Sequence, residues 1–530
     1  MRTLRALAVR TRAQRSDTQS SPVERSLERV QSEKRREYLR RALALGAVSA
    51  LPWRFGPALA AATAARVIIV GGGLAGLAAA HMLAQVGIRA RVFEGSPRVG
   101  GRCWTERRAF DDGQIAERGG ELIDTSHDAI RTLAASFALP LDDLLETEPK
   151  GSEAAWMFDG APYPLDIAAA DMAQMLTRLD ADARCLEMYL PTFRRHTPAQ
   201  RALDQLSAAD WIATRVDGGL KSRFGRLVAN AYMEELGGDL AEISAVTVVA
   251  LLMATPHDTF SPYEESDQRY HIRGGNDQLV RMLAERVEAQ IEMGTRLTAL
   301  VRNDRGQVRL AFARDQARQD AIADRVILAL PFSLLRDVDL ERSAFRARKL
   351  RAIRELEMGR NTKLQLQFRE RAWLRANGNG ETRIEGSYLT SWDVTRAQSG
   401  EAGILNFFSG GTLAVRAGDG TPEERARDAI VDVERIYPGI GALWNGKVIR
   451  NAWDRNPWSR GSYSLLKPSQ YTSFHGIEWE PEGTVYFAGE HTSEASSGYL
   501  NGAIESGQRA ATEVLASLGV KISRNMQRAA

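Results

Sequence analysis

The sequence contains few of the residues that build disulfide frameworks or metal centres. Its 530 residues include two cysteines, Cys103 and Cys185, and seven histidines without HExxH spacing. Two cysteines cannot supply the several bridges of a disulfide-rich domain or a cysteine-rich set of metal ligands. We therefore expect neither a disulfide framework nor a zinc site.

The sequence also lacks long hydrophobic runs and a large net charge. No stretch reaches 18 uninterrupted apolar residues, and a bilayer-spanning helix needs about 20. The net charge is +3, but residues 1–60 alone hold 13 basic and 5 acidic residues, so residues 61–530 are mildly acidic. We therefore expect no stable membrane span and no nucleic-acid partner.

The N-terminal segment carries most of that basic excess. Lys34-Arg35-Arg36, the weakly apolar residues 42–51 and the small residues Ala58-Leu59-Ala60 together resemble a bacterial twin-arginine export signal with its cleavage site. A basic amphipathic helix or a disordered tail is the alternative. The export interpretation predicts a periplasmic or secreted protein. Because this route carries folded proteins, it also predicts a cofactor site further along the chain.

A dinucleotide-binding pattern follows directly. The apolar residues 67–70 precede Gly71-x-Gly73-x-x-Gly76, and a helix-forming stretch comes next. Gly71 permits the turn, Gly73 lets the backbone approach a diphosphate, and Gly76 lets helix and strand pack closely. Glu94, at the end of the next predicted strand, can accept hydrogen bonds from ribose hydroxyls, although a solvated strand end is the other interpretation. The pattern predicts a βαβ unit that binds a diphosphate at a helix N-terminus.

Two further glycine pairs indicate FAD rather than NAD. The run Arg98-Val99-Gly100-Gly101-Arg102 resembles the second glycine signature of the amine oxidase and related FAD families, in which the arginine supplies a charged fork. The pair Gly119-Gly120 resembles the turn that passes near the flavin in those proteins. By the same resemblance, Leu297 is expected at the adenine end, with a backbone contact only.

The C-terminal region carries an independent part of the same resemblance. Residues 485–488 predict a buried strand, Gly489 and Glu490 follow, and a long helix is expected from about Leu500. This order resembles the C-terminal segment of flavin-containing amine oxidases, whose last helix points its N-terminus at the flavin. A helix N-terminus would stabilise negative charge on reduced flavin.

The resemblance implies an α/β fold, with a Rossmann-like FAD-binding domain of the amine oxidase type and an inserted substrate-binding domain of helices and a mixed sheet. Helical spacing of apolar residues prevails between 125 and 265, and alternating strands prevail from about 340 to 450. The expected division is a leader at 1–60, an FAD-binding domain at 61–124, 266–335 and 450–520, a substrate-binding domain at 125–265 and 336–449, and a tail at 521–530.

Four residues are expected to act on the substrate. Lys363 lies four residues after Gly359, the spacing at which amine oxidases of this family carry a lysine that holds a water against flavin N5. A solvated strand lysine is the alternative. Trp453 and Tyr463 lie ten residues apart, as the family's tryptophan and first cage tyrosine do, and Tyr499 matches the facing cage position. Two such rings would orient a neutral amine and exclude water.

Two neighbouring positions concern how FAD is held and what surrounds it. Some family members attach flavin through a cysteine just before the first cage tyrosine, and here that residue is Ser462. We therefore expect non-covalent FAD. Trp458 is interpreted as a core-packing residue.

The substrate is less well defined by the sequence. The whole chain is most similar to bacterial L-amino acid oxidases, which implies oxidation of L-amino acids, apolar or aromatic ones preferred, by molecular oxygen to 2-oxo acids, ammonia and hydrogen peroxide. An amino acid carboxylate needs an arginine partner. The position where venom-type amino acid oxidases carry it is Leu122, and Arg455, Arg460 or another arginine is left open as a substitute. We expect an aromatic-rich cavity with no acidic partner for a second ammonium.

Other functions remain open at this point. The pair of cage tyrosines is typical of a monoamine oxidase, and a polyamine oxidase is a further alternative. A non-catalytic flavin scaffold belongs to another class of protein, and Lys363, the cage and the export signal argue against it. The expected partners are a small amino acid or amine and oxygen, and a homodimer is left open.

Overall fold

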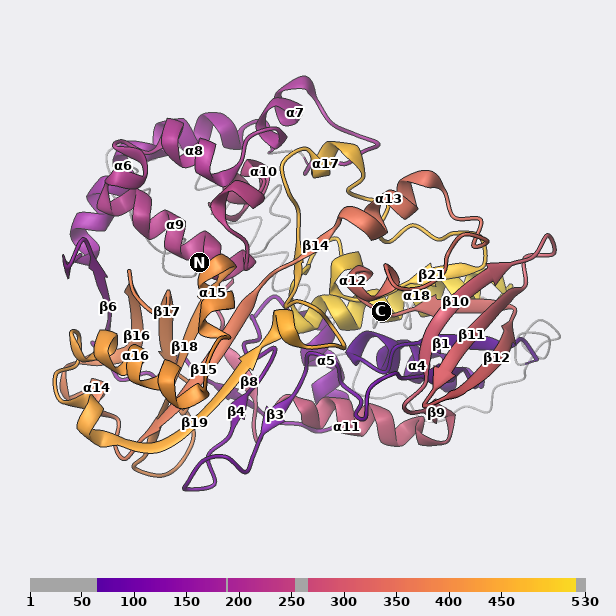
Figure 1. The fold of residues 1–530 in the computed structure, drawn as a ribbon, viewed down its shortest axis with the longest axis horizontal. Helices are drawn as coiled ribbons and strands as arrows, with labels where there is room; N and C mark the ends of the chain where they lie inside the picture. The colour runs from indigo at the N-terminus through magenta and orange to yellow at the C-terminus, as the bar shows by residue number, and fades with distance from the viewer. Residues whose placement is uncertain (1–63, 187–188, 253–265, 521–530) are drawn as a thin grey trace, which may run out of the picture.

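The computed structural model describes residues 64–186, 189–252 and 266–520, so the predicted export signal lies outside the described residues. They form two lobes, one built on a parallel sheet and the other on a larger mixed sheet with a group of helices (Figure 1). Within these ranges, no helix combines the length and the apolar character that a membrane span requires. The predicted α/β fold class is confirmed.

The parallel sheet draws its strands from widely separated parts of the chain. All neighbouring strands are parallel, in the order β21 (Val485–Phe487), β13 (Arg325–Leu328), β1 (Val67–Val70), β2 (Arg91–Phe93) and β9 (Ile291–Glu292). All four residues of β1 are buried, as expected for the central strand of a parallel sheet that is covered on both faces. The apolar run before the glycine turn is therefore the middle strand of this lobe.

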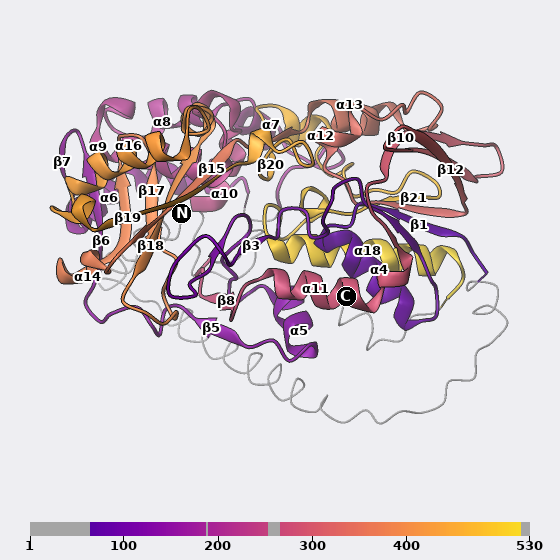
Figure 2. The ribbon, with the colours of Figure 1, turned by 60° about the horizontal axis from the view of Figure 1, so that its bottom comes forward.

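Helices cover one face of this sheet. They are α4 (Leu74–Gln85), α5 (Asp128–Ser136), α11 (Asp277–Arg286) and α18 (Leu500–Ser517). Figure 2 shows α18, α4 and α11 next to one another. A Cβ on Gly507 of α18 would lie 2.2 Å from the carbonyl oxygen of Ala75 on α4. Glycine at this crossing lets the C-terminal helix lie directly on the first helix of the lobe.

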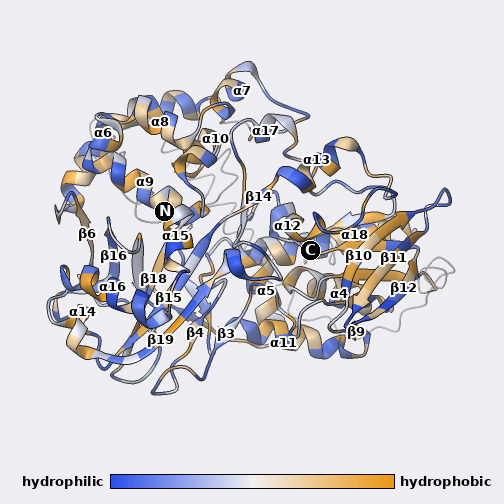
Figure 3. Ribbon diagram, in the orientation of Figure 1, coloured by the Kyte–Doolittle hydropathy of each residue, from blue (hydrophilic) through white to orange (hydrophobic). Residues whose placement is uncertain are grey.

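A three-stranded antiparallel sheet covers the other face. Its strands are β10 (Arg296–Arg302), β11 (Val308–Arg314) and β12 (Ala317–Ala323). Phe312 of β11 stacks on Phe93 of β2 with ring centroids 4.1 Å apart. Strands β10 and β11 are largely hydrophobic in colour in Figure 3, which agrees with their place over a buried core. The lobe thus has three layers.

The second lobe contains a seven-stranded mixed sheet and a helical group. The strand order is β19 (Trp444–Ala452), β15 (Asn361–Phe368), β18 (Gly403–Gly410), β17 (Thr390–Asp393), β16 (Gly378–Ile384), β6 (Glu153–Phe158) and β7 (Ala161–Pro162). The helices of the group are α6 (Leu165–Ala183), α7 (Pro198–Asp204), α8 (Ala208–Arg215), α9 (Arg223–Leu236) and α10 (Ala245–Leu252). Their buried apolar residues belong to one cluster. The range 125–265 is largely helical, as predicted, but α5 packs in the first lobe, and β6 and β7 are strands.

Shorter elements connect and border the two lobes. The strands are β3 (Thr105–Glu106), β4 (Ala116–Glu117), β5 (Leu141–Asp143), β8 (Tyr270–Ile272), β14 (Glu357–Met358) and β20 (Ser464–Leu465). The helices are α12 (Phe332–Leu335), α13 (Ala347–Glu355), α14 (Ala372–Arg375), α15 (Gly411–Ala417), α16 (Pro422–Glu434) and α17 (Gln470–Ser473).

Strand β15 carries different side chains on its two faces. Leu364, Leu366 and Phe368 pack into the apolar cluster that includes α16. Lys363 and Gln365, on the opposite face, both donate to the carbonyl oxygen of Glu117 at 3.2 Å. Because successive side chains of a strand point to opposite faces, the alternating sequence of β15 directs Lys363 away from the core and toward the β3–β4 hairpin.

Candidate functional site

The glycine turn after β1 has two crowded positions and one open position. A Cβ on Gly76 would lie 1.9 Å from the carbonyl oxygen of Gly71, and Gly71 itself has φ +110°. A Cβ on Gly73 would meet nothing within 4 Å. Helix α4 begins after Gly73 without a side-chain cap. Packing therefore requires two of the glycines, and the third leaves space in front of a helix N-terminus, which favours an anion.

Glu94 lies beside this turn, directly after β2. It is 9% exposed, so the interpretation as a solvated strand end is wrong. Its carboxylate oxygens accept hydrogen bonds from the backbone N–H of Gly72 at 2.6 Å and of Ser96 at 2.7 Å. A carboxylate has about four acceptor positions, so capacity remains for the hydroxyls of a ribose.

Trp458 lines the same cavity and lies beside Gly95, and Leu297 of β10 lines it too. Its side chain is 38% exposed, and a Cβ on Gly95 would lie 2.8 Å from its ring. The interpretation of Trp458 as core packing is therefore wrong. The turn after Trp453 exposes part of the ring, and the ring packs on the glycine that follows Glu94.

The second arginine-glycine signature joins the N- and C-terminal motifs. Arg102 Nη1 lies 2.8 Å from Glu490 Oε1, and it also donates to the carbonyl oxygen of Ser462. Burial alone would raise the pKa of Glu490, but the positive charge of Arg102 holds that pKa below its usual value. Arg98 instead donates to the carbonyls of its own loop, including that of Gly101.

The glycine pair 119–120 fits tightly between those two motifs. A Cβ on Gly119 would lie 1.8 Å from the carbonyl oxygen of Arg102, and a Cβ on Gly120 would lie 2.7 Å from Leu500. Leu500 is the first residue of α18. Segments almost 400 residues apart in the sequence therefore meet at this turn, as the resemblance implies.

One cavity of about 1020 Å³ extends past these segments into the second lobe. All but one of the predicted site residues line it. They are Gly71, Gly73, Glu94, Arg98, Gly101, Arg102, Gly119, Gly120, Leu297, Lys363, Trp453, Tyr463, Gly489, Glu490, Tyr499 and Leu500. Gly76 is the exception, because it lies behind the turn where helix α4 packs on β1.

Lys363 is buried in the wall of this cavity, with a side chain 7% exposed, so the interpretation as a solvated lysine is wrong. Its Nζ lies 2.6 Å from Glu121 Oε2 and 3.2 Å from the carbonyl oxygen of Glu117. The other carboxylate oxygen of Glu121 accepts from Trp392 Nε1 at 2.8 Å. A lysine ammonium has three donors, so one N–H remains for a group in the cavity. The sequence reasoning missed Glu121, although it directly follows the Gly119-Gly120 pair.

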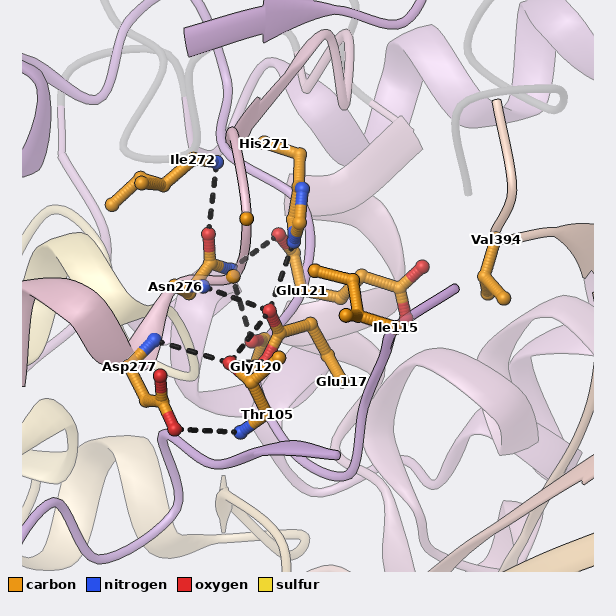
Figure 4. Close-up of polar contacts among 12 residues, drawn as sticks. Thr105, Ile115, Glu117, Gly120, Glu121, His271, Ile272, Asn276, Asp277 and Val394 are labelled. Carbon is orange, nitrogen blue, oxygen red and sulfur yellow. Dashed lines mark hydrogen bonds and ion pairs between the residues drawn. The ribbon is translucent and has the colours of Figure 1, made fainter. Parts of the chain in front are cut away.

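A buried polar network supports the glycine pair from behind (Figure 4). The carboxylate of Glu117 accepts from Thr105 Oγ1, from the backbone N–H of Asn276 and from His271 Nε2. Asn276 donates in turn to the carbonyl oxygens of Gly120 and Glu121. Burial opposes a charge on His271, but its hydrogen bond to Glu117 raises its pKa above the usual value. The network determines the position of the turn that carries Glu121.

The two predicted cage tyrosines meet the end of helix α9. Tyr463 donates its hydroxyl hydrogen to the carbonyl oxygen of Glu234 at 3.1 Å, and Tyr499 donates to Glu235 Oε1 at 3.2 Å. Burial first, and then the charges of Glu235 and Glu234, raise the pKa of Tyr463 well above its usual value. The Tyr463 hydroxyl is therefore neutral, and both rings are oriented by the same helix end.

Trp453 and Ser462 complete this part of the wall. Trp453 Nε1 donates to the carbonyl oxygen of Arg118 at 3.0 Å, and its ring lies next to Gly119. The hydroxyl of Ser462 donates to Asn361 Oδ1. The structure therefore brings the aromatic positions, the glycine pair and Lys363 into one chamber, which we call the cage end of the cavity.

The charge at the cage end differs from the expectation. Glu121, Glu234 and Glu235 line the cavity, so the expectation of no acidic partner for a second ammonium is wrong. Sequence reasoning missed Glu234 and Glu235 because no motif indicates that the end of α9 lines the cavity.

Neither arginine left open as a carboxylate partner lies at the cage. Arg455 donates to the carbonyl oxygen of Gly418 and pairs with Asp419. Arg460 lines the opposite end and pairs with Asp337 at 2.5 Å. Among the described residues that line the cavity, Lys363 is the only lysine, and Arg102, which reaches the carbonyl oxygen of Ser462, is paired with Glu490.

The residues at the opposite end of the cavity, around the glycine turn, fit a flavin dinucleotide. Space lies open in front of Gly73, next to the N-terminus of α4, where a diphosphate can approach the backbone. Glu94 offers acceptors for ribose, and the cavity continues from there to the cage. Within the described residues, no group of histidine, cysteine or acidic side chains is arranged to hold a metal ion.

Comparisons with known proteins agree with this geometry. A family model described as flavin containing amine oxidoreductase matches residues 74–515. The chain is 28% identical to a flavin-dependent L-tryptophan oxidase of Lentzea aerocolonigenes, covering 86% of this chain and 98% of that protein. It is 24% identical to a flavin-containing amine oxidase A of Canis lupus familiaris, covering 86% of this chain and 85% of that protein.

A solved structure also resembles the fold. The chain matches the structure of a cyclohexylamine oxidase from Brevibacterium oxydans IH-35A with a TM-score of 0.74 and 21% identity, over 86% of this chain and 99% of that one. This match confirms the predicted fold class, a Rossmann-like domain of the amine oxidase type with a second lobe of helices and mixed sheet.

Proposed function

Because the chain belongs to the flavin-containing amine oxidoreductase family, we propose that it is an FAD-dependent amine oxidase that uses molecular oxygen as its electron acceptor. One observation carries the proposal: a single cavity joins the glycine turn at α4 to Lys363 and to the tyrosines 463 and 499. A flavin scaffold without catalysis would not require a buried lysine and two aligned tyrosines at the far end of the same cavity.

The residues of the cage end have separable tasks in this reaction. Bound FAD supplies the acceptor for the hydride that leaves the carbon next to the amine. Tyr463 and Tyr499 present neutral ring faces that orient an uncharged amine and keep water away from it. Lys363 offers its free N–H to a water or to oxygen. Hydrolysis of the imine product releases ammonia, and oxygen is converted to hydrogen peroxide.

Primary amines without a carboxylate are the substrate class that the cavity favours. A buried carboxylate requires a cationic partner, and the one lysine at the cage end is already paired with Glu121 at 2.6 Å. The acidic side chains there suit a substrate that arrives as an ammonium ion.

L-amino acids are the second candidate. The likeness to the L-tryptophan oxidase supports them, and apolar or aromatic ones would suit the neighbouring rings of Trp392 and Phe408, whose centroids lie 5.4 Å apart. Oxidation would then yield a 2-oxo acid. This candidate requires a partner for the carboxylate other than Arg455 or Arg460.

Two further properties belong to the proposal. Ser462 stands where a cysteine would be needed for a thioether, which supports non-covalent FAD, so acid or heat should release the flavin. The pair Arg35-Arg36 supports export by the twin-arginine route. Replacing both by lysine should leave a folded, FAD-containing precursor in the cytoplasm.

The test measures products with three matched substrates, namely phenethylamine, L-phenylalanine and D-phenylalanine. The proposal predicts one hydrogen peroxide and one ammonia for each substrate consumed, with phenethylamine the fastest. Preference for L-phenylalanine would support the second candidate. Absence of peroxide and ammonia across a broad panel of amines and amino acids would contradict amine oxidase activity.

A further inference from the structure

The end of helix α9 forms the outer rim of the cage. Both cage tyrosines direct their hydroxyl groups to it, one to a carbonyl oxygen and the other to the carboxylate of Glu235. The hydroxyl is the end of a tyrosine side chain farthest from its backbone. Glu235 therefore lies beyond the ring faces that would flank the reacting amine.

Glu235 differs from the other acidic residues of the cage end. Glu121 pairs with Lys363 and accepts from Trp392. Glu234 pairs with Arg383, whose side chain is 5% exposed. Among the described residues, neither a lysine nor an arginine forms an ion pair with Glu235, which lines the cavity and is half-buried.

Acidic groups and a neutral histidine lie on the side of Glu235 that faces Asp124. Burial first, and then the charges of Asp267 and Glu235, raise the pKa of Asp124 to about 6. Burial lowers the pKa of the nearby His127 to about 4, so this ring is neutral at pH 7. The helix end adds the negative end of the α9 dipole.

We propose that Glu235 determines substrate specificity by binding a second cationic group, an ammonium or guanidinium, at the far end of an amine whose other end is oxidised. This inference rests on the proposed function, because it names the substrate class of the same site. A carboxylate that is half-buried and lacks a cation gains most from a charged hydrogen-bond partner. Diamines and amino acids with basic side chains both supply such a group.

The test compares matched substrates that differ in the second charge. Anaerobic bleaching of the bound flavin is followed with 1,4-diaminobutane against butylamine, and with L-lysine against L-norleucine. The wild-type protein should prefer the dicationic member of at least one pair by tenfold or more in the second-order rate constant. If 1,4-diaminobutane reacts faster than L-lysine, a diamine is the source of the second cation. If L-lysine reacts faster, the source is a basic amino acid.

Variants then assign that preference to Glu235. Glu235→Gln keeps an acceptor for the hydroxyl of Tyr499 but removes the charge, and the preference should fall by about tenfold, as for a site that loses its partner for one substrate group. Glu235→Asp keeps the charge but withdraws it by one methylene, so the preferred diamine should lengthen by one carbon. Asp217→Asn, which removes an exposed carboxylate of the same lobe, should leave the preference as it is.

The outcomes separate the inference from the proposed function. Bleaching by all four substrates without a preference for the dicationic ones would overturn the inference and leave the amine oxidase intact. An undiminished preference in Glu235→Gln would also overturn it. Failure of every amine to bleach the flavin would overturn the proposed function itself.

Discussion

The two ends of the cavity are built from different parts of the polypeptide. At the end around the glycine turn, which we call the glycine end, backbone geometry makes the site: Gly71 and Gly76 have no room for a Cβ, and the space in front of Gly73 is open. At the cage end, side chains make it: Lys363 lies on β15, and Glu235 lies on α9. Where the backbone forms the site, certain positions accept only a few residue types. Where side chains form it, a substitution can change the charge of the site without changing the fold.

Removing Lys363 should have the largest effect. Lys363→Met would leave Glu121 buried, with a side chain 9% exposed, and without its cation. The loss of one partner of a buried pair costs about 3–5 kcal/mol of unfolding free energy, measured by urea denaturation of the FAD-bound protein. The double variant Lys363→Met/Glu121→Gln should regain part of this loss. Equal stabilities of the single and double variants would show that the pair is not coupled.

The glycine turn offers a contrast between two neighbouring positions. Gly76→Ala places a methyl group 1.9 Å from a backbone oxygen and should lower the unfolding free energy by about 3 kcal/mol. Gly73→Ala meets nothing within 4 Å and has φ −72°, so the stability of the FAD-free protein should stay the same. Its affinity for FAD should fall instead. Equal losses of stability in both variants would contradict the distinction between packing and cofactor approach.

This contrast also explains what the sequence could predict. Gly71, Gly76 and Gly119 are recognisable because the close approach of a backbone carbonyl oxygen allows one residue type only, whereas Gly73 is recognisable by its place in the glycine pattern before the helix. The alternation of apolar and polar residues in β15 also indicated that Lys363 does not face the apolar core, because successive side chains of a strand point to opposite faces. Glu235 was not predictable, because an acidic residue at a helix end is ordinarily solvated. Its place in the cavity depends on how α9 packs against the tyrosines 463 and 499.

The pH dependence of stability tests the electrostatics of the cage end. Because the folded-state pKa of Asp124, about 6, lies above its ordinary value of 3.8, its contribution to stability is present at low pH and is lost as the pH rises through 6. Asp124→Asn removes this penalty, so its gain over wild type should be about 2 kcal/mol larger at pH 8 than at pH 4.5. Because His127 Nε2 lies 3.3 Å from Asp124 Oδ2, the same comparison in a His127→Asn background removes the opposite contribution of the histidine. A gain independent of pH would contradict the assignment.

Replacing Trp458 should have the smallest effect, and only FAD binding at the glycine end should change. Its ring packs over Gly95 at the rim of the cavity, and Trp458→Ala should weaken FAD binding by about 1 kcal/mol, the scale of one aromatic contact. Fluorescence of released FAD after dilution measures this change. A slower reduction of the bound flavin by amines, with FAD release unchanged, would place Trp458 in the substrate site instead.

The most direct test of the division between the two ends is the rate of anaerobic flavin bleaching by one amine in the wild-type protein and in Tyr499→Ala. This variant removes a cage ring and the hydroxyl that contacts Glu235, but none of the contacts of the glycine turn. The account predicts bleaching slower by about tenfold or more, since the ring orients the amine, with FAD affinity unchanged. Equal bleaching rates combined with weakened FAD binding would contradict the assignment of the substrate to this end of the cavity.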